Sequence, residues 1–316
     1  MITLSILTGF LGSGKTTLLN RLLRDPDMAT TAVLVNELGD VGIDNLIVDR
    51  VDEDIVLLES GCVCCSVRDD LTSSLLALSA RAERHEIPAF DHAVLETTGI
   101  ADPGAILQLL MGDELICSHY RPGNVVTVVD ACYALQNFDE IPEVTQQVLL
   151  ADKLVLSKTD LVDGDRLRIL RARLEGLNSM SPVYYSSDVS PADLFRTALE
   201  LKPRKPIDVL RHANRYATFH IGWQEAVSWP AIETWIEGLL SARGQDLFRI
   251  KGIMNIKGEE CPVVFQAVQH SVYKPSHLQS WPGGAPRTDL VFIAKNFTEE
   301  AALNSLKPFI DVAMDA

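Results

Sequence analysis

An eight-residue segment near the start of the chain has the residue types and spacing of a phosphate-binding loop. Residues 9–16 read GFLGSGKT, which matches the pattern G-x-x-x-x-G-K-[ST] in full. In such a loop the glycines let backbone N–H groups turn toward a β-phosphate at the positive end of a helix. The lysine reaches the β- and γ-phosphates, and the hydroxyl that follows it binds Mg²⁺. The candidate nucleotide contacts here are Gly9, Gly12, Ser13, Gly14, Lys15, Thr16 and Thr17.

A second segment, SKTD at 157–160, resembles the N/T-K-x-D motif with which P-loop GTPases read guanine. Asp160 at a strand end can accept from guanine N1–H and N2–H₂ together, whereas adenine presents an acceptor at N1. This carboxylate therefore indicates GTP rather than ATP. Lys158 would lie over the base, and Ser157 replaces the commoner Asn, which predicts weaker anchoring of the loop. Ser186, near the end of a later apolar run, is a further candidate nucleotide contact.

Two segments are candidates for the γ-phosphate side of the site. HAVLETTG at 92–99 supplies Glu96 at a strand end, to hold Mg²⁺ through water or to order the attacking water. Its Gly99 could donate an N–H to the γ-phosphate. The polar, glycine-containing NELGDVGIDN that follows the second apolar run has the texture of a switch loop or of an ordinary solvated loop. Its candidate contacts are Asn36, Glu37, Asp40 and Asp44.

The stretch ESGCVCCSVRDD holds three of the six cysteines, Cys62, Cys64 and Cys65. Thiolates suit Zn²⁺, and structural zinc usually takes four ligands, so three cysteines would leave one position open for transfer. Adjacent Cys64 and Cys65 would point to opposite faces of a strand, so a shared ion requires a turn, which Gly61 makes feasible. A thiol redox switch and simple packing of small apolar side chains remain as alternatives.

These candidate residues lie beside apolar runs that alternate with helical patterns. Nearly continuous Val/Leu runs separated by helices predict an α/β domain with a mostly parallel sheet covered on both faces, as in P-loop NTPases. We expect strands within residues 2–7, 31–37, 54–60, 92–99, 124–131, 153–160 and 182–187, and helices within 16–25, 69–84, 102–112 and 166–177.

The remainder of the chain predicts a smaller α+β domain. The pattern fits a sandwich of split βαβ, ferredoxin-like type in the order β-α-β-β-α-β. We expect strands within 215–223, 247–257, 262–273 and 289–296, and helices within 229–243 and 298–310. Proline and basic residues cluster just before it, as in an exposed connector. The expected organisation is a GTPase domain at 1–203, a linker at 204–213 and a C-terminal domain at 214–316.

Composition narrows the class of protein. A chain of 316 residues is long enough for two domains, each with its own core. The net charge of -15, without a long Lys/Arg run, argues against nucleic-acid and anionic-membrane partners. The N-terminus has no basic region or cleavage site of a signal peptide, and no apolar run reaches the roughly 20 residues that span a bilayer. We therefore expect a cytoplasmic protein, where clustered cysteines are more often metal ligands or redox groups than disulfides.

Together these segments resemble the CobW-like metallochaperone GTPases, in the wider group of the urease and hydrogenase nickel-insertion GTPases. The segments that carry the resemblance are TGFLGSGKTTLLN, NELGDVGID, GCVCC, ETTGIADP, SKTD, FRIKGI and RTDLVFIAKN. The resemblance implies a slow GTPase that binds Zn²⁺, or alternatively Co²⁺ or Ni²⁺, and hands it to a client metalloprotein. It implies catalytic roles for Lys15, Thr16, Glu37, Glu96 and Gly99. It makes Cys62, Cys64 and Cys65 the zinc ligands, and Thr16, Glu37, Asp40 and Glu96 the Mg²⁺ or switch-side ligands.

The leading hypothesis is that GTP and Mg²⁺ order the switch loop and thereby change metal affinity or client contact in the GCVCC segment. On this hypothesis the partners of the protein are GTP or GDP and the client metalloprotein. Association into a homo-oligomer is compatible with it. The alternative is a regulatory GTP switch whose cysteines respond to oxidation and which delivers no metal.

Overall fold

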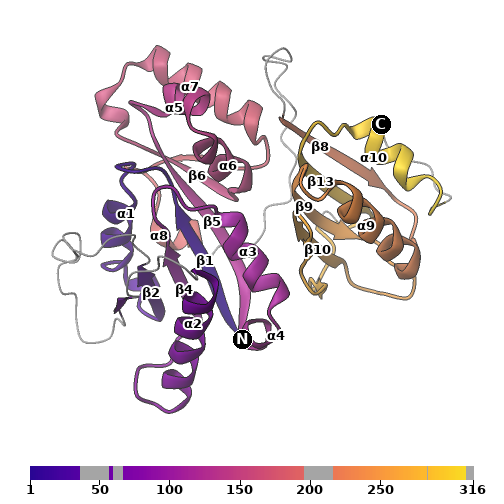
Figure 1. Cartoon of the computed structure of the whole chain (residues 1–316), viewed down its shortest axis with the longest axis horizontal. Helices are drawn as coiled ribbons and strands as arrows, with labels where there is room; N and C mark the ends of the chain where they lie inside the picture. Colours follow the sequence, from indigo (N-terminus) through magenta and orange to yellow (C-terminus); the bar gives the residue numbers. More distant parts are fainter. Residues whose placement is uncertain (36–56, 60–66, 196–215, 283, 311–316) are drawn as a thin grey trace. The chain divides into compact units, whose positions relative to one another are not determined.

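The computed structural model describes residues 1–35, 57–59, 67–195, 216–282 and 284–310. The chain forms two compact units (Figure 1): Met1–Leu174 with Ser181–Glu200, and Glu175–Met180 with Leu201–Ala316. The expected linker, 204–213, lies outside the described residues. Within the described ranges, no helix combines the length and the apolar character needed to cross a membrane.

The first unit is built on a seven-stranded sheet in the order β3-β2-β4-β1-β5-β6-β7. Every pair of neighbouring strands in it is parallel, which confirms the predicted sheet. Its strands are nearly continuous apolar runs because both faces are covered by helices. The strands are β1 (Ile2–Thr8), β2 (Thr31–Val35), β3 (Leu57–Glu59), β4 (His92–Glu96), β5 (Tyr120–Asp130), β6 (Lys153–Ser157) and β7 (Val183–Tyr185).

Helices lie on both faces of this sheet. On β5, Val126 and Val128 share a core with Leu19 of α1 and with α8, whereas Thr127 between them donates to the Gln147 carbonyl of α6 at 2.8 Å. Since successive strand residues point to opposite faces, α6 covers the face away from α1. The helices are α1 (Lys15–Leu22), α2 (Val67–Glu83), α3 (Pro103–Gly112), α4 (Glu114–His119), α5 (Ala134–Glu140), α6 (Pro142–Leu150), α7 (Gly164–Leu177) and α8 (Pro191–Phe195), with 3-10 turns η1 (Pro26–Met28) and η3 (Thr159–Leu161).

The second unit has a six-stranded sheet in the order β11-β10-β9-β13-β8, with β12 paired to β10. Strand β13 is antiparallel to both β8 and β9, so these two run parallel on either side of it. The unit β8-α9-β9 is therefore a split βαβ, as predicted. Helix α9 packs Trp235 and Ile236 onto Phe265 and Phe292 of the sheet. The elements are β8 (Tyr216–Trp223), α9 (Trp229–Arg243), β9 (Leu247–Met254), β10 (Val263–Val268), β11 (Ser271–Val272), β12 (Ser276–His277), β13 (Thr288–Lys295) and α10 (Glu299–Leu306).

The long elements follow the order of the strand and helix ranges expected from the sequence, but the label β-α-β-β-α-β is wrong at one point, because the second helix follows the last long strand instead of preceding it. The segment between β10 and β13 contains Pro275, Pro282 and Pro286, and it forms only the two short strands that pair with β10. Proline cannot continue a helix interior, which explains why the described residues of this segment contain no helix. Helix α10 begins later, where the Thr298 hydroxyl accepts from the Ala301 N–H at 3.2 Å.

Candidate nucleotide-binding site

The loop between β1 and α1 adopts a conformation that its glycines make accessible. Gly9, Gly12 and Gly14 have φ angles of 142°, 70° and 96°, a region that side chains disfavour. A Cβ atom at Gly9 would lie 2.3 Å from the Val128 carbonyl oxygen. The loop that carries the predicted phosphate-binding motif therefore has a backbone conformation that its three glycines favour, and it leads into the N-terminus of α1.

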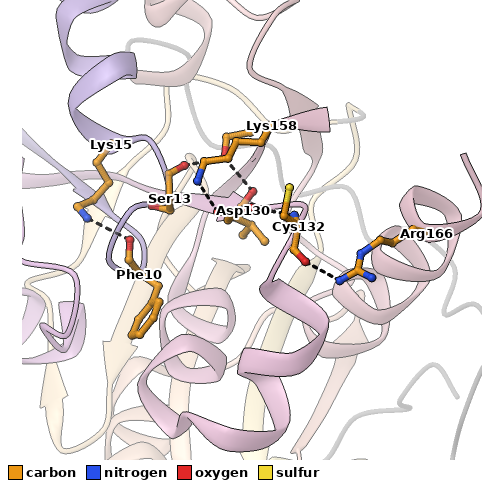
Figure 2. A network of polar contacts seen from close by, with 9 residues as sticks. Phe10, Ser13, Lys15, Asp130, Cys132, Lys158 and Arg166 are labelled. Atoms are coloured by element: carbon orange, nitrogen blue, oxygen red, sulfur yellow. Dashed lines mark hydrogen bonds and ion pairs between the residues drawn. The ribbon is translucent and has the colours of Figure 1, made fainter. Parts of the chain in front are cut away.

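Lys15 lies across this loop. Its ammonium donates to the carbonyl oxygen of Gly9 at 2.9 Å. It also donates to the carbonyl oxygen of Phe10 at 3.3 Å (Figure 2). The Ser13 N–H also donates to the Phe10 carbonyl, at 3.1 Å, which closes a turn in the loop. The Ser13 hydroxyl is buried and has no hydrogen-bond partner among the described residues. Lys15 and the N-terminus of α1 together concentrate positive charge at this loop, which suits an anionic ligand.

A cleft of about 580 Å³ opens in front of the loop. Glu96, at the end of β4, reaches it while remaining only 5% exposed. The Thr16 hydroxyl donates to Glu96 Oε1 at 3.4 Å, so two predicted Mg²⁺-side residues meet in the cleft. The cleft is lined by Leu11, Gly12, Gly14, Lys15, Thr16, Glu96, Thr97, Thr98, Gly99 and Ile100.

Gly99 touches the phosphate loop directly. A Cβ atom at Gly99 would lie 2.6 Å from the Leu11 backbone nitrogen. The sequence predicts a glycine here because the backbone would approach the γ-phosphate. The structure adds a second reason, because the backbones of Gly99 and Leu11 approach each other closely. Only a glycine permits this approach without moving one of the two loops.

The predicted base-reading motif lies at the end of β6, beside the predicted phosphate loop. The Ser157 hydroxyl donates to the Ser13 carbonyl at 2.6 Å, so Ser does make an anchoring bond to the phosphate loop in place of the commoner Asn. Lys158 has φ of 53°, and its ammonium pairs with Asp130 Oδ2 at 2.6 Å (Figure 2). Asp160 lies in the 3-10 turn η3 and is exposed to solvent. The two motifs are thus joined by a direct hydrogen bond.

Asp130 is a residue of this site that sequence reasoning missed. It ends β5 and is buried, and besides Lys158 it accepts from the Cys132 N–H through Oδ1 at 2.8 Å. The Cys132 carbonyl in turn accepts from Arg166 of α7 (Figure 2). The sequence did contain a signal for Asp130, because this residue is a carboxylate at the end of a buried apolar strand, the same pattern that identified Glu96.

Arg21 was also missed. Its guanidinium donates to the Ser186 carbonyl and, at 2.6 Å, to the Val189 carbonyl, which ties α1 to the loop after β7. The Ser186 N–H donates to the Leu156 carbonyl at 2.9 Å, so this predicted contact lies next to the end of β6. Thr17 is exposed on α1. No sequence signal distinguished Arg21 from the other polar positions of its helix.

The cysteine cluster and the expected switch segment stand between β2 and α2 in the sequence. Cys62, Cys64, Cys65, Asn36, Glu37, Asp40 and Asp44 lie outside the described residues. Across the part of the chain that is described, no three His, Cys, Asp or Glu side chains gather into a group that could hold a metal ion. The described cysteines, Cys117, Cys132 and Cys261, are free, and burial raises the pKa of the Cys117 thiol.

Comparisons with known proteins cover almost the whole chain. The family model described as the CobW/HypB/UreG nucleotide-binding domain matches residues 3–185, and the cobalamin synthesis protein cobW C-terminal domain matches 216–310. The chain is 34% identical to the zinc chaperone YjiA of Escherichia coli over 310 residues, covering 95% of this chain and 96% of that protein. It is 35% identical over 190 residues to a zinc-regulated GTPase metalloprotein activator of Schizosaccharomyces pombe, covering 58% of this chain and 45% of that one. The crystal structure of Zn(II)-bound YjiA GTPase superposes with a TM-score of 0.71 at 28% identity, covering 98% of this chain and 99% of that chain.

Proposed function

The chain belongs to the CobW/HypB/UreG family, and on that premise we propose that it is a GTP-hydrolysing metallochaperone that binds Zn²⁺ and passes it to a client metalloprotein. The main support for nucleotide binding is that the phosphate-binding motif and the base-reading motif lie side by side at one edge of the sheet. The phosphate loop follows β1 and the base-reading loop follows β6, and the Ser157–Ser13 hydrogen bond joins them. A nucleotide with phosphates on Lys15 and a base at Asp160 fits that arrangement.

Each part of GTP has a group in the chain that suits it. The glycine loop and Lys15 supply positive charge for the β- and γ-phosphates, and Asp160 supplies the carboxylate that guanine needs. Thr16 and Glu96 place two hard oxygen donors together in the cleft, which fits Mg²⁺. When bound, Mg²⁺ would neutralise charge that develops on the phosphate oxygens. Gly99 faces the phosphate loop, where its N–H would meet a γ-phosphate.

For the metal we propose Cys62, Cys64 and Cys65 as ligands of zinc, with Co²⁺ or Ni²⁺ as alternative cargo. The support is the thiolate chemistry of these residues and the printed names of the relatives, which are zinc chaperones and a zinc-regulated metalloprotein activator. A three-thiolate site leaves one position for a client's ligand, which suits transfer rather than storage.

The topology supports a coupling between nucleotide and metal. Val35 of β2 pairs with Glu59 of β3 on one side and with Glu96 of β4 on the other. The three strands therefore end at the same level, and Glu59 lies two strand spacings, about 10 Å, from Glu96. Cys62 follows Glu59 by three residues. In the sequence, the switch candidates Glu37, Asp40 and Asp44 stand between β2 and β3, and the cysteine segment follows β3 directly.

The test is the Zn²⁺ affinity of the metal-free protein, measured by competition with a chromophoric chelator in two nucleotide states. We expect GDP and a non-hydrolysable GTP analogue with Mg²⁺ to give affinities that differ by about tenfold, a usual size for coupling between two sites. Replacing the three clustered cysteines by Ser should abolish both tight binding and the nucleotide effect.

The matched control replaces Cys117, Cys132 and Cys261 by Ser, which also removes three thiols and should leave the affinity unchanged. Zinc that binds equally well to the clustered-cysteine variant would contradict the ligand assignment. Cysteines that bind no zinc but react with peroxide in a nucleotide-dependent way would favour the alternative, a redox-responsive GTP switch without metal delivery.

A further inference from the structure

Gln147 connects α6 to the loop that follows β4. Its side chain is 1% exposed, and its amide nitrogen donates to the Gly99 carbonyl at 3.2 Å and to the Ala101 carbonyl at 3.1 Å. A primary amide has two N–H donors, and both are used here. Because both neighbours are acceptors, the amide oxygen could not take this place, so the orientation of the group is determined.

The loop that Gln147 holds is the one that faces the phosphate loop. Its beginning is fixed to β1, where the Thr97 N–H donates to the Leu7 carbonyl at 2.9 Å. Its end is fixed by Asp102, which caps α3 by accepting from the Gly104 N–H at 2.7 Å and whose pKa is raised by burial. Gly99 lies between these two anchors, with the phosphate loop on one side and Gln147 bonded to its carbonyl.

We propose that Gln147 is a positioning residue that holds the backbone of Gly99 at the cleft, so that the Gly99 N–H can donate a hydrogen bond to the γ-phosphate. The inference rests on the proposed function, because it assigns a role within GTP recognition. Gln147 does not line the cleft, so its effect passes through Gly99. Without its two bonds, the Gly99 and Ala101 carbonyls would lose their buried donors, and the loop between the two anchors would have to move to find others.

The distinguishing readout is the ratio of GTP to GDP affinity, since only GTP carries the phosphate that Gly99 would contact. A residue that merely stabilises the fold would change both affinities together. We expect Gln147→Met, which keeps the length of the side chain, to lower the ratio of affinities for a GTP analogue and GDP by about tenfold, the effect of one or two lost buried hydrogen bonds. The rate of hydrolysis at saturating GTP should fall by at least as much.

Thr127→Val is the matched control. It removes the buried hydrogen bond to the backbone carbonyl of the same residue, Gln147, without touching the loop after β4. It should lower thermal stability while leaving the affinity ratio and the hydrolysis rate within about twofold of the original, since the two hydrogen bonds from the Gln147 side chain to the Gly99 and Ala101 carbonyls stay in place.

A second variant, Gln147→Leu, is smaller and also has no hydrogen-bond donor, so it decides the matter if the Met variant does not fold. An unchanged affinity ratio in whichever variant folds, or the same change in Thr127→Val, would overturn the positioning role. A wild-type chain that hydrolyses no GTP would instead contradict the proposed function itself, and the inference with it.

Discussion

Gly99 is the residue of the candidate site where added volume has the clearest cost. Its Cβ would lie 2.6 Å from the Leu11 backbone nitrogen, so a methyl group must displace either the phosphate loop or the loop after β4. We predict that Gly99→Ala lowers the affinity for a GTP analogue by tenfold or more. It should also destabilise the protein by about 1–3 kcal/mol, the usual range for overpacking. Titration with a fluorescent GTP analogue and thermal unfolding measure the two effects.

Gly112→Ala is the control for this prediction. Gly112 ends α3 with open space around the Cβ position and without a positive φ. Alanine there should be neutral or stabilising by up to about 1 kcal/mol, since it reduces the freedom of the unfolded chain. If Gly99→Ala behaves like Gly112→Ala in both measurements, the two backbones are not held in close approach in solution.

At this scale the sequence predicted the residues that belong to contiguous motifs and missed those defined by distant partners. The phosphate-loop glycines, Lys15, Thr16 and Glu96 could be found because each follows a strand in a recognisable pattern. Asp130, Gln147 and Arg21 act through partners 28, 48 and 165 positions away. No local pattern encodes such a contact, because it depends on which strands and helices become neighbours.

At the scale of elements, the strands of the first sheet were predicted and four of its helices were not. All seven strands of the first sheet lie within or overlap the predicted apolar runs. Four helices were missed, α4, α5, α6 and α8, which have only six, seven, nine and five residues. Helix α6 shows why, since its buried residues include the polar Thr145 and Gln147 beside Val144 and Val148. Polar residues at buried positions interrupt the apolar stripe by which a helix is recognised in a sequence.

The ion pair between Asp130 and Lys158 joins the ends of two neighbouring strands, β5 and β6. We predict that Asp130→Asn weakens GTP and GDP binding equally, by about three- to tenfold. The reason is that the Lys158 ammonium loses the charged carboxylate that holds it in place in the base-reading motif. Both nucleotides share the base, so their ratio should not change. The Asn side chain retains an oxygen for the Cys132 N–H, which limits the damage to the strand end.

The control for Asp130→Asn removes a carboxylate from an exposed ion pair. Asp165 and Arg168 lie 3.4 Å apart with both side chains mostly exposed, a kind of pair that contributes little. Asp165→Asn should leave both affinities unchanged. A selective loss of GTP over GDP in Asp130→Asn would place its effect at the phosphates and refute a role at the base.

For the whole molecule, the distribution of cores and tryptophans allows the two units to be observed separately. Each unit contains a core cluster of its own, one under α1 and α8 and one under α9 and α10. All four tryptophans, Trp223, Trp229, Trp235 and Trp281, belong to the second unit, and Trp223 and Trp235 are buried. Tryptophan emission therefore reports the unfolding of the second unit, whereas far-ultraviolet circular dichroism reports both.

All described residues of the candidate nucleotide site belong to the first unit, so a bound nucleotide should stabilise that unit alone. At a GDP concentration of about 100 times Kd, with Mg²⁺, the stabilisation is about 2.7 kcal/mol. For a unit of this size that raises the first unfolding transition by roughly 5–10 °C. We predict this shift in the dichroism and none in the tryptophan transition, with no shift for ATP or for Lys15→Ala. If tryptophan emission moves by the same amount, the units unfold as one cooperative body, and nucleotide binding then acts on the C-terminal unit as well.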